Sequence, residues 1–433
     1  MNPRNFQWLV GAAVVALIAA IWVSMGSQPA SEGSEKANVA LFAGLRDHLN
    51  DVDAVTLSGG GNKALVTLKH DSDGWHVAER SGYPAELSKV REFVIKLADA
   101  TVIETKTSNP KRYADLGVED MSAPDAKGVV VALSGQKAPT KLIVGLFNGG
   151  GGGGTFVRRD GEAQSLLAKG NLLAEKDPAA WIKKDLASVE AERIKQVSIL
   201  GIDGKVVRVY KDTNFDANFK IADVPKGREP ASEYVANSLG SGLSNLRIDD
   251  VAAAKDTPAP DKAFKIHYLA FGGLAVDVTA WDAGGRNAVQ IVASNDATQL
   301  EGDIVAAQAK AKGAYDTDVA RAKLKVVEAK GDDAAIAKAE AEIAKPPSLV
   351  DPGKDAAARR EAAGKVVDDL NKRFAGWTFY VPAYEFANFN KTMEELLKPV
   401  LGKDAAGKST PSIKLPLPGA VPAAAAQPLP QSH

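Results

Sequence analysis

The chain contains no cysteine in its 433 residues, and this absence excludes several kinds of site at once. Without a thiol there is no disulfide, no thiolate metal ligand, no cysteine nucleophile and no lipid anchor of the bacterial lipoprotein type. The stability of the fold must therefore come from packing.

The chain also lacks an excess of either charge. It has 53 lysine and arginine residues against 54 aspartate and glutamate residues, so no basic surplus exists to neutralise a polyanion. We therefore expect no nucleic-acid partner. The composition, 45% hydrophobic and 25% charged, is typical of folded protein, and the length allows two globular cores.

An uncharged apolar run at residues 9–26 follows the short N-terminal segment MNPRNFQW. This run just reaches the length that crosses a bilayer. Arg4 precedes it and acidic and polar residues follow it, so the positive-inside rule places the bulk of the chain outside the cytoplasm. A cleaved signal peptide is the alternative, but the run is long for one and no A-x-A-like site follows. We expect residues 1–26 to be a cytoplasmic stub and an uncleaved single-pass anchor in the inner membrane, with the rest periplasmic.

The body of the chain is built on a pattern that occurs twice. After a polar linker at 27–48, residues 49–190 and 191–402 each begin with two strands, a turn and a third strand. Val55 aligns with Val197 at an offset of 142 residues, and a further group of strands follows in both copies. The sequence therefore predicts two tandem, related modules.

Between the two groups of strands, the first copy carries a helix-like segment at residues 84–100, PAELSKVREFVIKLADA. Four of its apolar residues have helical spacing: Leu87, Val90, Val94 and Leu97. In the second copy, residues 230–246 take the place of this helix. The expected fold class is α+β, with two tandem related modules of mainly antiparallel sheet plus helices, an N-terminal transmembrane helix and a helical insertion in the second module.

The insertion is expected at about 296–375. Residues 155–157 (TFV) resemble residues 378–380 (TFY), but at an offset of 223 rather than 142, which leaves 81 extra residues in the second copy. The extra segment is rich in Ala, Lys and Glu, which are strong helix formers. We expect a helical hairpin or short bundle that projects from the second module.

Two uses are open for this insertion: a solvated spacer, or a surface for a partner helix. Its apolar residues are enough for one narrow seam, and packing within the insertion is the favoured use of that seam. The residues concerned are Ile304, Val305, Val319, Leu324, Val326, Val327, Ile336, Ile343, Val366, Val367 and Leu370. The chain ends in a Pro- and Ala-rich tail at 403–433, whose composition is typical of disorder.

Six consecutive glycines at residues 149–154 raise the question of a phosphate-binding loop. Such a loop needs a helix after its glycines, because the helix N-terminus supplies amide groups and a favourable dipole. Here the strand-like segment 155–159 follows. A hairpin turn is therefore favoured over a phosphate site.

Residues 402–409, GKDAAGKS, match the Walker A pattern through Gly402, Gly407, Lys408 and Ser409. That loop must leave a buried strand and open a helix, whereas this stretch follows a helical segment and precedes a proline-rich tail. Gly402 is better interpreted as a helix C-cap, and no nucleotide is expected to bind.

HDSDGWH at residues 70–76 brings four possible metal ligands together: His70, Asp71, Asp73 and His76. The segment lacks most ligands of a calcium loop, and DSDG is strong turn chemistry, so a turn between two strands is favoured over a metal site. His48 and His267 are interpreted as surface or half-buried residues.

Two motifs for nucleophilic and metal-assisted catalysis are missing, since the chain has no G-x-S-x-G and no H-E-x-x-H. The nearest stretch, GSGLSN at 240–245, is interpreted as the end of a helical segment. We therefore predict no catalytic, cofactor-binding or metal-binding residues and no cofactor.

Several features of the first copy follow one another in a recognisable order. They are LVTLKHDSDGWHVAE, the helix that begins at Pro84, YADLGV at 113–118, the KLIVG strand with Gly145, the TFVRR strand and the closing WIKKDLASV. In this order, residues from about 50 to 200 resemble a bacterial family catalogued as domain of unknown function 4340. The resemblance implies a membrane-anchored extracytoplasmic protein, often encoded beside ABC-type transporter components similar to those of gliding-motility systems. The family has no established activity, so the resemblance assigns no site residues.

These observations favour a non-enzymatic function. We expect a membrane-anchored periplasmic binding or scaffold protein, accessory to an ABC-transporter-like membrane complex, whose partners are the inner membrane and a protein of that complex. The first alternative is a binder of envelope glycan or peptidoglycan, with a ligand in the cleft between the modules or on exposed Trp or Tyr of one sheet face. A hydrolase with an unrecognised site ranks last.

Overall fold

The structure is a computed structural model that describes residues 39–135, 140–150, 153–187, 189–329, 331–347 and 349–399. The expected anchor at 9–26, the Walker-like segment at 402–409 and the tail at 403–433 lie outside the described residues. Within the described ranges, no helix is both long enough and apolar enough to cross a membrane.

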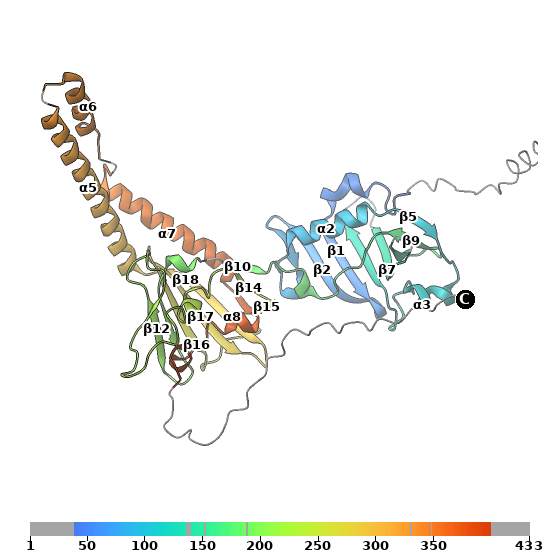
Figure 1. Ribbon diagram of the computed structural model, residues 1–433. Coiled ribbons are helices and arrows are strands. Elements are labelled where there is room, and N and C mark those ends of the chain that lie inside the picture. Colours follow the sequence, from blue (N-terminus) through green and yellow to red (C-terminus); the bar gives the residue numbers. More distant parts are fainter. Residues whose placement is uncertain are drawn as a thin grey trace, which may run out of the picture.

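The first module is a nine-stranded antiparallel sheet (Figure 1). Its strand order is β4-β3-β2-β1-β6-β7-β8-β9-β5. The strands are β1 (Ala54–Gly59), β2 (Lys63–Asp71), β3 (Gly74–Val77), β4 (Tyr83–Pro84), β5 (Val102–Thr105), β6 (Val129–Ser134), β7 (Thr140–Asn148), β8 (Gly154–Arg159) and β9 (Ser165–Lys169). In β1 the side chains alternate between buried and half-buried positions, as the period of a strand requires.

One helix of the first module, α2 (Leu87–Ala98), lies across the sheet (Figure 1). The side chain of Glu86 caps it by accepting a hydrogen bond from the backbone N–H of Ser88. One face of the helix is buried in the core through Val90, Phe93, Val94, Leu97 and Ala98. The helix expected at this place is confirmed.

The second module is an eight-stranded antiparallel sheet, with a separate two-stranded ladder between β10 (Asp185–Ala187) and β14 (Leu246–Arg247). Its order is β13-β12-β11-β16-β17-β18-β19-β15. The strands are β11 (Ile194–Leu200), β12 (Val206–Tyr210), β13 (Lys220–Ile221), β15 (Asp250–Ala253), β16 (Phe264–Ala270), β17 (Leu274–Asp282), β18 (Asn287–Asn295) and β19 (Trp377–Tyr380). Apart from β4, this is the strand order of the first module. The α+β class with mainly antiparallel sheets is confirmed.

The equivalence of strands corrects one alignment made from the sequence. By topology β19 corresponds to β9, because each pairs with the strand that closes its sheet, β15 or β5. The matching of residues 378–380 with 155–157 in β8 is therefore wrong by one strand. The first four residues of β9 are all buried, so it lacks the alternation that marks a half-exposed strand in a sequence.

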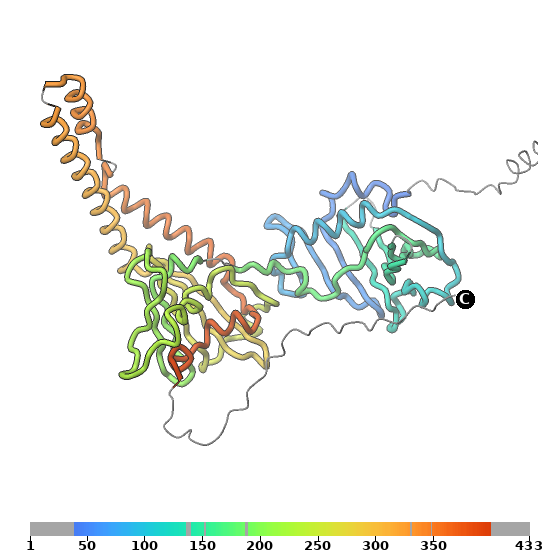
Figure 2. The backbone as a smooth tube through the Cα atoms, viewed as in Figure 1, coloured from blue at the N-terminus to red at the C-terminus, as the bar shows by residue number. Residues whose placement is uncertain are grey.

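Three helices connect β18 to β19, whereas residues 160–164 make the equivalent connection between β8 and β9. They are α5 (Ala297–Glu328), α6 (Asp333–Ile343) and α7 (Pro352–Phe374). In Figures 1 and 2, α5 rises away from the sheet, α6 runs back beside its far half, and α7 returns beside its near half. We call residues 310–350 the distal arm.

The helix expected at 230–246 is reduced to one turn, α4 (Asn237–Gly240). Gly240 lies so close to the ring of Phe219 that a β-carbon there would collide with it. Glycine is therefore required at this position, and Gly240 and Gly242 also weaken the helix. The short helices that complete the fold are α3 (Tyr113–Leu116), α8 (Ala383–Phe386) and α9 (Met393–Leu396), with 3-10 turns η1 (Leu45–Asp51), η2 (Gly60–Asn62), η3 (Ala78–Arg80), η4 (Pro110–Arg112), η5 (Pro178–Ala180) and η6 (Ala191–Arg193).

The YADLGV segment is clamped onto the first sheet by a buried arginine. Arg158 donates hydrogen bonds to the carbonyl oxygen of Val118 at 2.9 Å and to Asp120 at 2.5 Å, and its guanidinium lies 4.6 Å from the ring centre of Tyr113. Beneath the segment, Gly145 of β7 lies against the carbonyl oxygens of Leu116 and Gly117. This contact leaves no room for a side chain.

We expect Gly145→Ala to destabilise the first module by about 1–3 kcal/mol, because the added methyl group must displace backbone rather than a movable side chain. Urea denaturation followed by tryptophan fluorescence measures the loss. Gly302→Ala in α5 is the control, since nothing lies within 4 Å of its added carbon. An equal effect of the two substitutions would contradict the close approach at Gly145.

Candidate functional site

The six glycines connect two paired strands. Asn148 at the end of β7 pairs with Gly154 at the start of β8, and Gly153 has a φ of 71°, which favours glycine. A strand rather than a helix follows the run. The hairpin interpretation is confirmed.

The HDSDGWH segment forms the turn between β2 and β3. The backbone N–H of Asp73 donates to Asp71 Oδ1 at 2.9 Å, and His76 Nε2 lies 3.0 Å from the same oxygen. The N–H of Asp73 and then the ring of His76 hold the pKa of Asp71 below its usual value. In the part of the chain that the structure describes, no three His, Asp or Glu side chains lie together as metal ligands. The turn interpretation is confirmed.

Two further histidines, His48 and His267, each have an aspartate partner. His48 Nδ1 lies 2.8 Å from Asp51, and His267 on β16 lies 2.8 Å from Asp277 on β17. Both histidines are exposed or half-buried, as expected. In the 240–245 segment, the hydroxyl of Ser244 donates to the carbonyl oxygen of Val189. This hydrogen bond joins the segment to the connection between the two modules.

The two modules are joined by an ionic cluster. Arg80 of η3 donates to Asp250 of β15 at 2.5 Å, and Arg286 from the β17–β18 turn donates to the other carboxylate oxygen at 2.8 Å. The guanidinium of Arg286 also lies 3.4 Å from the ring centre of Tyr380. The hollow around this cluster is about 300 Å³, the lower end of the range for ligand sites.

Asp250 remains ionised in this cluster. Burial acts to raise its pKa, but hydrogen bonds from Arg80, the Val251 N–H and Arg286 outweigh that effect and hold the pKa below its usual value. The carboxylate is thus held between two cations, one from each module.

Aromatic and other apolar packing completes the junction between the modules. The ring of Tyr83 in β4 meets Trp377 edge-on at 5.1 Å and Phe379 at 6.2 Å, both in β19. Burial raises the pKa of Tyr83 to about 12. One hydrophobic cluster runs through both modules and includes Trp181 and Leu186 of the connecting segment. The junction is therefore packed, and the hollow of about 300 Å³ around the ionic cluster lies between the modules, where a cleft was expected.

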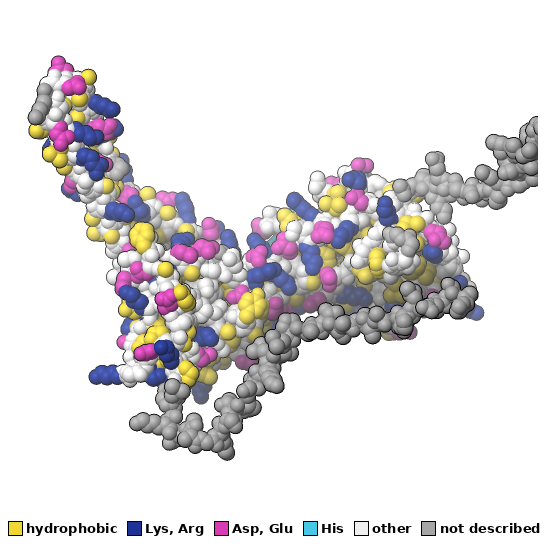
Figure 3. All heavy atoms as spheres, in the orientation of Figure 1, with side chains coloured by type: hydrophobic (Ala, Val, Ile, Leu, Met, Phe, Trp, Pro, Cys, Tyr) yellow, Lys and Arg dark blue, Asp and Glu magenta, His cyan; other side chains and the backbone are white. Residues whose placement is uncertain are grey.

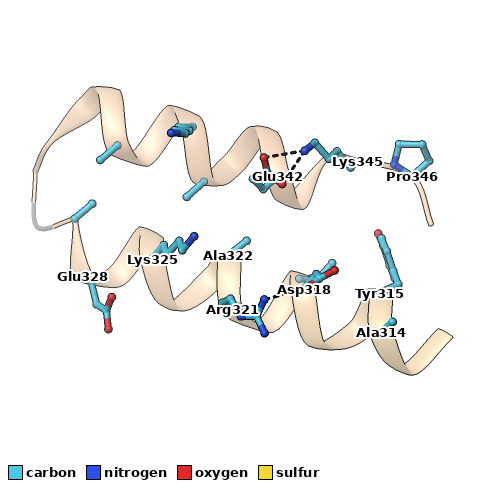
Figure 4. Close-up of a pocket in the computed structure, with 15 residues that line it drawn as sticks. Ala314, Tyr315, Asp318, Arg321, Ala322, Lys325, Glu328, Glu342, Lys345 and Pro346 are labelled. Atoms are coloured by element: carbon cyan, nitrogen blue, oxygen red, sulfur yellow. Dashed lines mark hydrogen bonds and ion pairs between the residues drawn. The ribbon is translucent and has the colours of Figure 1, made fainter. Parts of the chain in front are cut away.

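The distal arm has an open groove between α5 and α6, of about 820 Å³ (Figure 4). The contact between the two helices is made by small side chains, since Ala322 and Ala339 are the buried residues there. Charged side chains of both signs line the groove, among them Arg321, Lys325 and Glu342. Small residues at a helix seam leave space that a further helix can fill.

The apolar residues of the insertion are only partly used by packing within it. Ile304 is buried, and Val367 and Leu370 pack against the core of the second module. Val305, Leu324 and Val327 are 63%, 62% and 74% exposed. The expectation that self-packing uses up the seam is therefore wrong for these three residues. Figure 3 shows apolar and charged side chains of both signs mixed along the arm.

A second groove, which the sequence did not indicate, lies in the first module between α2, the β2–β3 hairpin and η1. Its volume is about 680 Å³. Leu87 belongs to the apolar spacing of α2 but is 43% exposed here, and Ile95 is 45% exposed. The sequence of α2 has more apolar residues than one buried helix face holds, and this excess could have indicated the groove.

Residues 75–264 match the model of the family described as Domain of unknown function (DUF4340). The resemblance is thus confirmed, although its bounds differ from those expected: the match begins at Trp75 in β3 and ends at Phe264, the first residue of β16. It covers most of the first module, the junction segment and the first strands of the second, and it stops before the arm. No curated protein and no solved structure matches the chain.

We expect Asp250→Asn to lower the stability of the joined modules by about 1–3 kcal/mol at neutral pH, because it removes the charge between Arg80 and Arg286. The folded pKa of Asp250 is lowered, so its stabilisation is complete above the unfolded value of about 3.9 and is lost as pH falls through the folded pKa. Thermal unfolding between pH 7 and pH 2 tests this: the wild type and the variant should converge only at the acidic end.

The control for this prediction is Asp185→Asn, which removes an exposed partner of Arg247 at 3.4 Å. An exposed pair of this kind contributes little, about 0.5 kcal/mol or less. If Asp250→Asn changed stability no more than this control, the ionic cluster would have no part in holding the modules together.

Proposed function

We propose that the chain is a non-enzymatic, membrane-anchored periplasmic scaffold protein, accessory to an ABC-transporter-like membrane complex, and that its distal arm is the surface that contacts this complex. The main support for this proposal is the shape and exposed surface of the distal arm. It extends from the second module (Figures 1 and 2). Its side chains Leu324 and Val327 are exposed to solvent.

The arm has the features of a helix-binding surface. Along residues 310–350 the structure has two helices side by side, with small residues at the seam and an open groove. A helix can add to such a pair along the groove. Leu324 and Val327 are not among the side chains that line this groove, so they form a second apolar surface on α5, outside it. Exposed apolar side chains of this size, next to charged ones, support a protein contact.

The contacts at the base of the arm also fit a surface that is held in a fixed position. At its base, Arg360 of α7 makes a two-pronged ion pair with Glu301 of α5, at 2.6 and 2.7 Å. Gln308 donates to the carbonyl oxygen of Pro352 and to Asp355. The base of the distal arm is thus tied together and joined to the core of the second module through Phe374, which is buried.

The glycan alternative has less support. A glycan site is expected to gather exposed aromatic rings on one sheet face. Among the described residues, the exposed aromatic side chains are those of Phe147, Phe215, Tyr234 and Tyr384. Phe147 lies on β7 and Tyr384 in α8, whereas Phe215 and Tyr234 lie in loops, so these four residues do not share one sheet face.

The test is a variant that lacks only the distal arm, with residues 310–350 replaced by a short Gly/Ser loop. The base should survive, because Gln308 and Pro352 are already in contact and the Arg360–Glu301 pair is retained. We expect the wild type to co-purify with subunits of a membrane complex from its native membrane, and the variant to lose them with unchanged thermal unfolding of the two sheets.

Point variants refine this test. Leu324→Gln with Val327→Gln should reduce the recovered subunits, whereas Ile202→Gln, at a position 61% exposed on the second module, should not. Recovery of the same subunits with the wild type and the armless variant would contradict the proposal.

A further inference from the structure

The groove of the first module is bordered by three elements that the fold fixes in place. Val52 follows η1 and lines one end of the groove, and Lys183 and Pro84 line it beside the start of α2. The backbone N–H of Lys183 donates to the carbonyl oxygen of Pro84 at 2.9 Å, so these two parts of the wall are tied together. Most of the lining side chains are apolar.

One wall is an exposed stripe on α2. Leu87, Arg91 and Ile95 are four residues apart and so lie on one side of the helix, next to the side buried in the core. The stripe is about 12 Å long, given the rise of an α-helix. Two large aliphatic side chains are thus held in solvent on either side of a cation.

The facing wall is aromatic. Trp75 of β3 is half-buried, and its ring lies 5.3 Å from that of His70 in β2. The carbonyl oxygen of Trp75 accepts a hydrogen bond from the backbone N–H of Ala85, just before α2. This bond fixes the distance between the aromatic wall and the helix.

Some charged side chains of the groove have hydrogen-bond partners, and others have none. The carboxylate of Glu86 accepts hydrogen bonds from the N–H and hydroxyl of Ser88. Asp73 lies at the exposed hairpin turn. Among the described residues, the side chains of Arg91 and Lys183 have no hydrogen-bond or ion-pair partner. Two cations without a counter-ion thus line an apolar groove.

We propose that this groove binds an apolar anion, an amphiphile with a chain and one acidic head group. The chain lies between Trp75 and the Leu87–Ile95 stripe, and the head group pairs with Arg91 and Lys183. The volume of about 680 Å³ and the mainly apolar lining with a few polar groups are those of small-ligand sites. This site is separate from the arm, so it does not depend on the proposed scaffold function.

Other occupants fit the groove less well. A sugar ring requires several planar polar side chains around its aromatic platform, whereas aliphatic residues dominate here. A partner helix needs a longer surface than a stripe of two turns. A membrane phospholipid and a free fatty acid share the proposed chemistry, and the experiment separates them.

The probe is dodecanoate carrying a diazirine in its chain, added to the full-length protein in phosphatidylcholine nanodiscs. After illumination, mass spectrometry should find the label on peptides containing Trp75 or residues 87–95. Excess dodecanoate should compete with the probe, and excess dodecanol should not, because it lacks the anionic group. If phosphatidylglycerol in the nanodisc also competes, the source of the ligand is a membrane lipid; if it does not, the source is a free acid.

The double variant Arg91→Gln/Lys183→Gln should reduce groove labelling roughly tenfold, since it removes both charged contacts with the head group. Lys63→Gln, an exposed cation of β2 outside the groove, is the matched control and should change nothing. All three positions are exposed, and circular dichroism checks that the fold is retained. Labelling outside the groove, labelling that survives in the double variant, or equal competition by dodecanol would each overturn the proposal.

Discussion

The packing of the β4 edge of the first sheet against β19 and β15 of the second is the contact on which the rest of the structure depends. Tyr83 lies against Trp377 and Phe379, Asp250 lies between Arg80 and Arg286, and the connecting segment pairs with the second module through β10. Apolar burial supplies the stabilisation there, and the ionised cluster fixes the orientation. Because the core is continuous, the two sheets form one support.

On this support the molecule presents two surfaces of different chemistry. The distal arm offers a groove with small residues between α5 and α6, and the exposed apolar residues Leu324 and Val327 outside that groove, which suits a protein contact. The groove beside α2 is short, apolar and lined by two unpaired cations, which suits a small amphiphile. The family match covers residues 75–264, so it includes the junction and most of the groove but stops before the arm.

The sequence predicted what depends on local periodicity. The alternating strands β1 and β11, the amphipathic helix α2 and the glycine hairpin follow from patterns of two and 3.6 residues. Prediction from the sequence failed where burial or long-range contacts determine the structure. Strand β9 was missed because it is almost wholly buried, and this error misplaced the equivalent of β19. The helix expected at 230–246 is only one turn, α4, in which the ring of Phe219 lies against Gly240. The Arg80–Asp250 cluster joins residues 170 positions apart, which no local pattern reports.

Site-specific photo-crosslinking in the native membrane tests whether the distal arm contacts a membrane complex. A photoreactive residue is placed at Val327 on the distal arm or at Ile202 on the second sheet module, two positions of comparable exposure. If the arm makes the contact, we expect an adduct with a membrane-complex subunit from Val327 and none from Ile202. No adduct from Val327, or the same adduct from both positions, would contradict a scaffold that makes its contact through the arm.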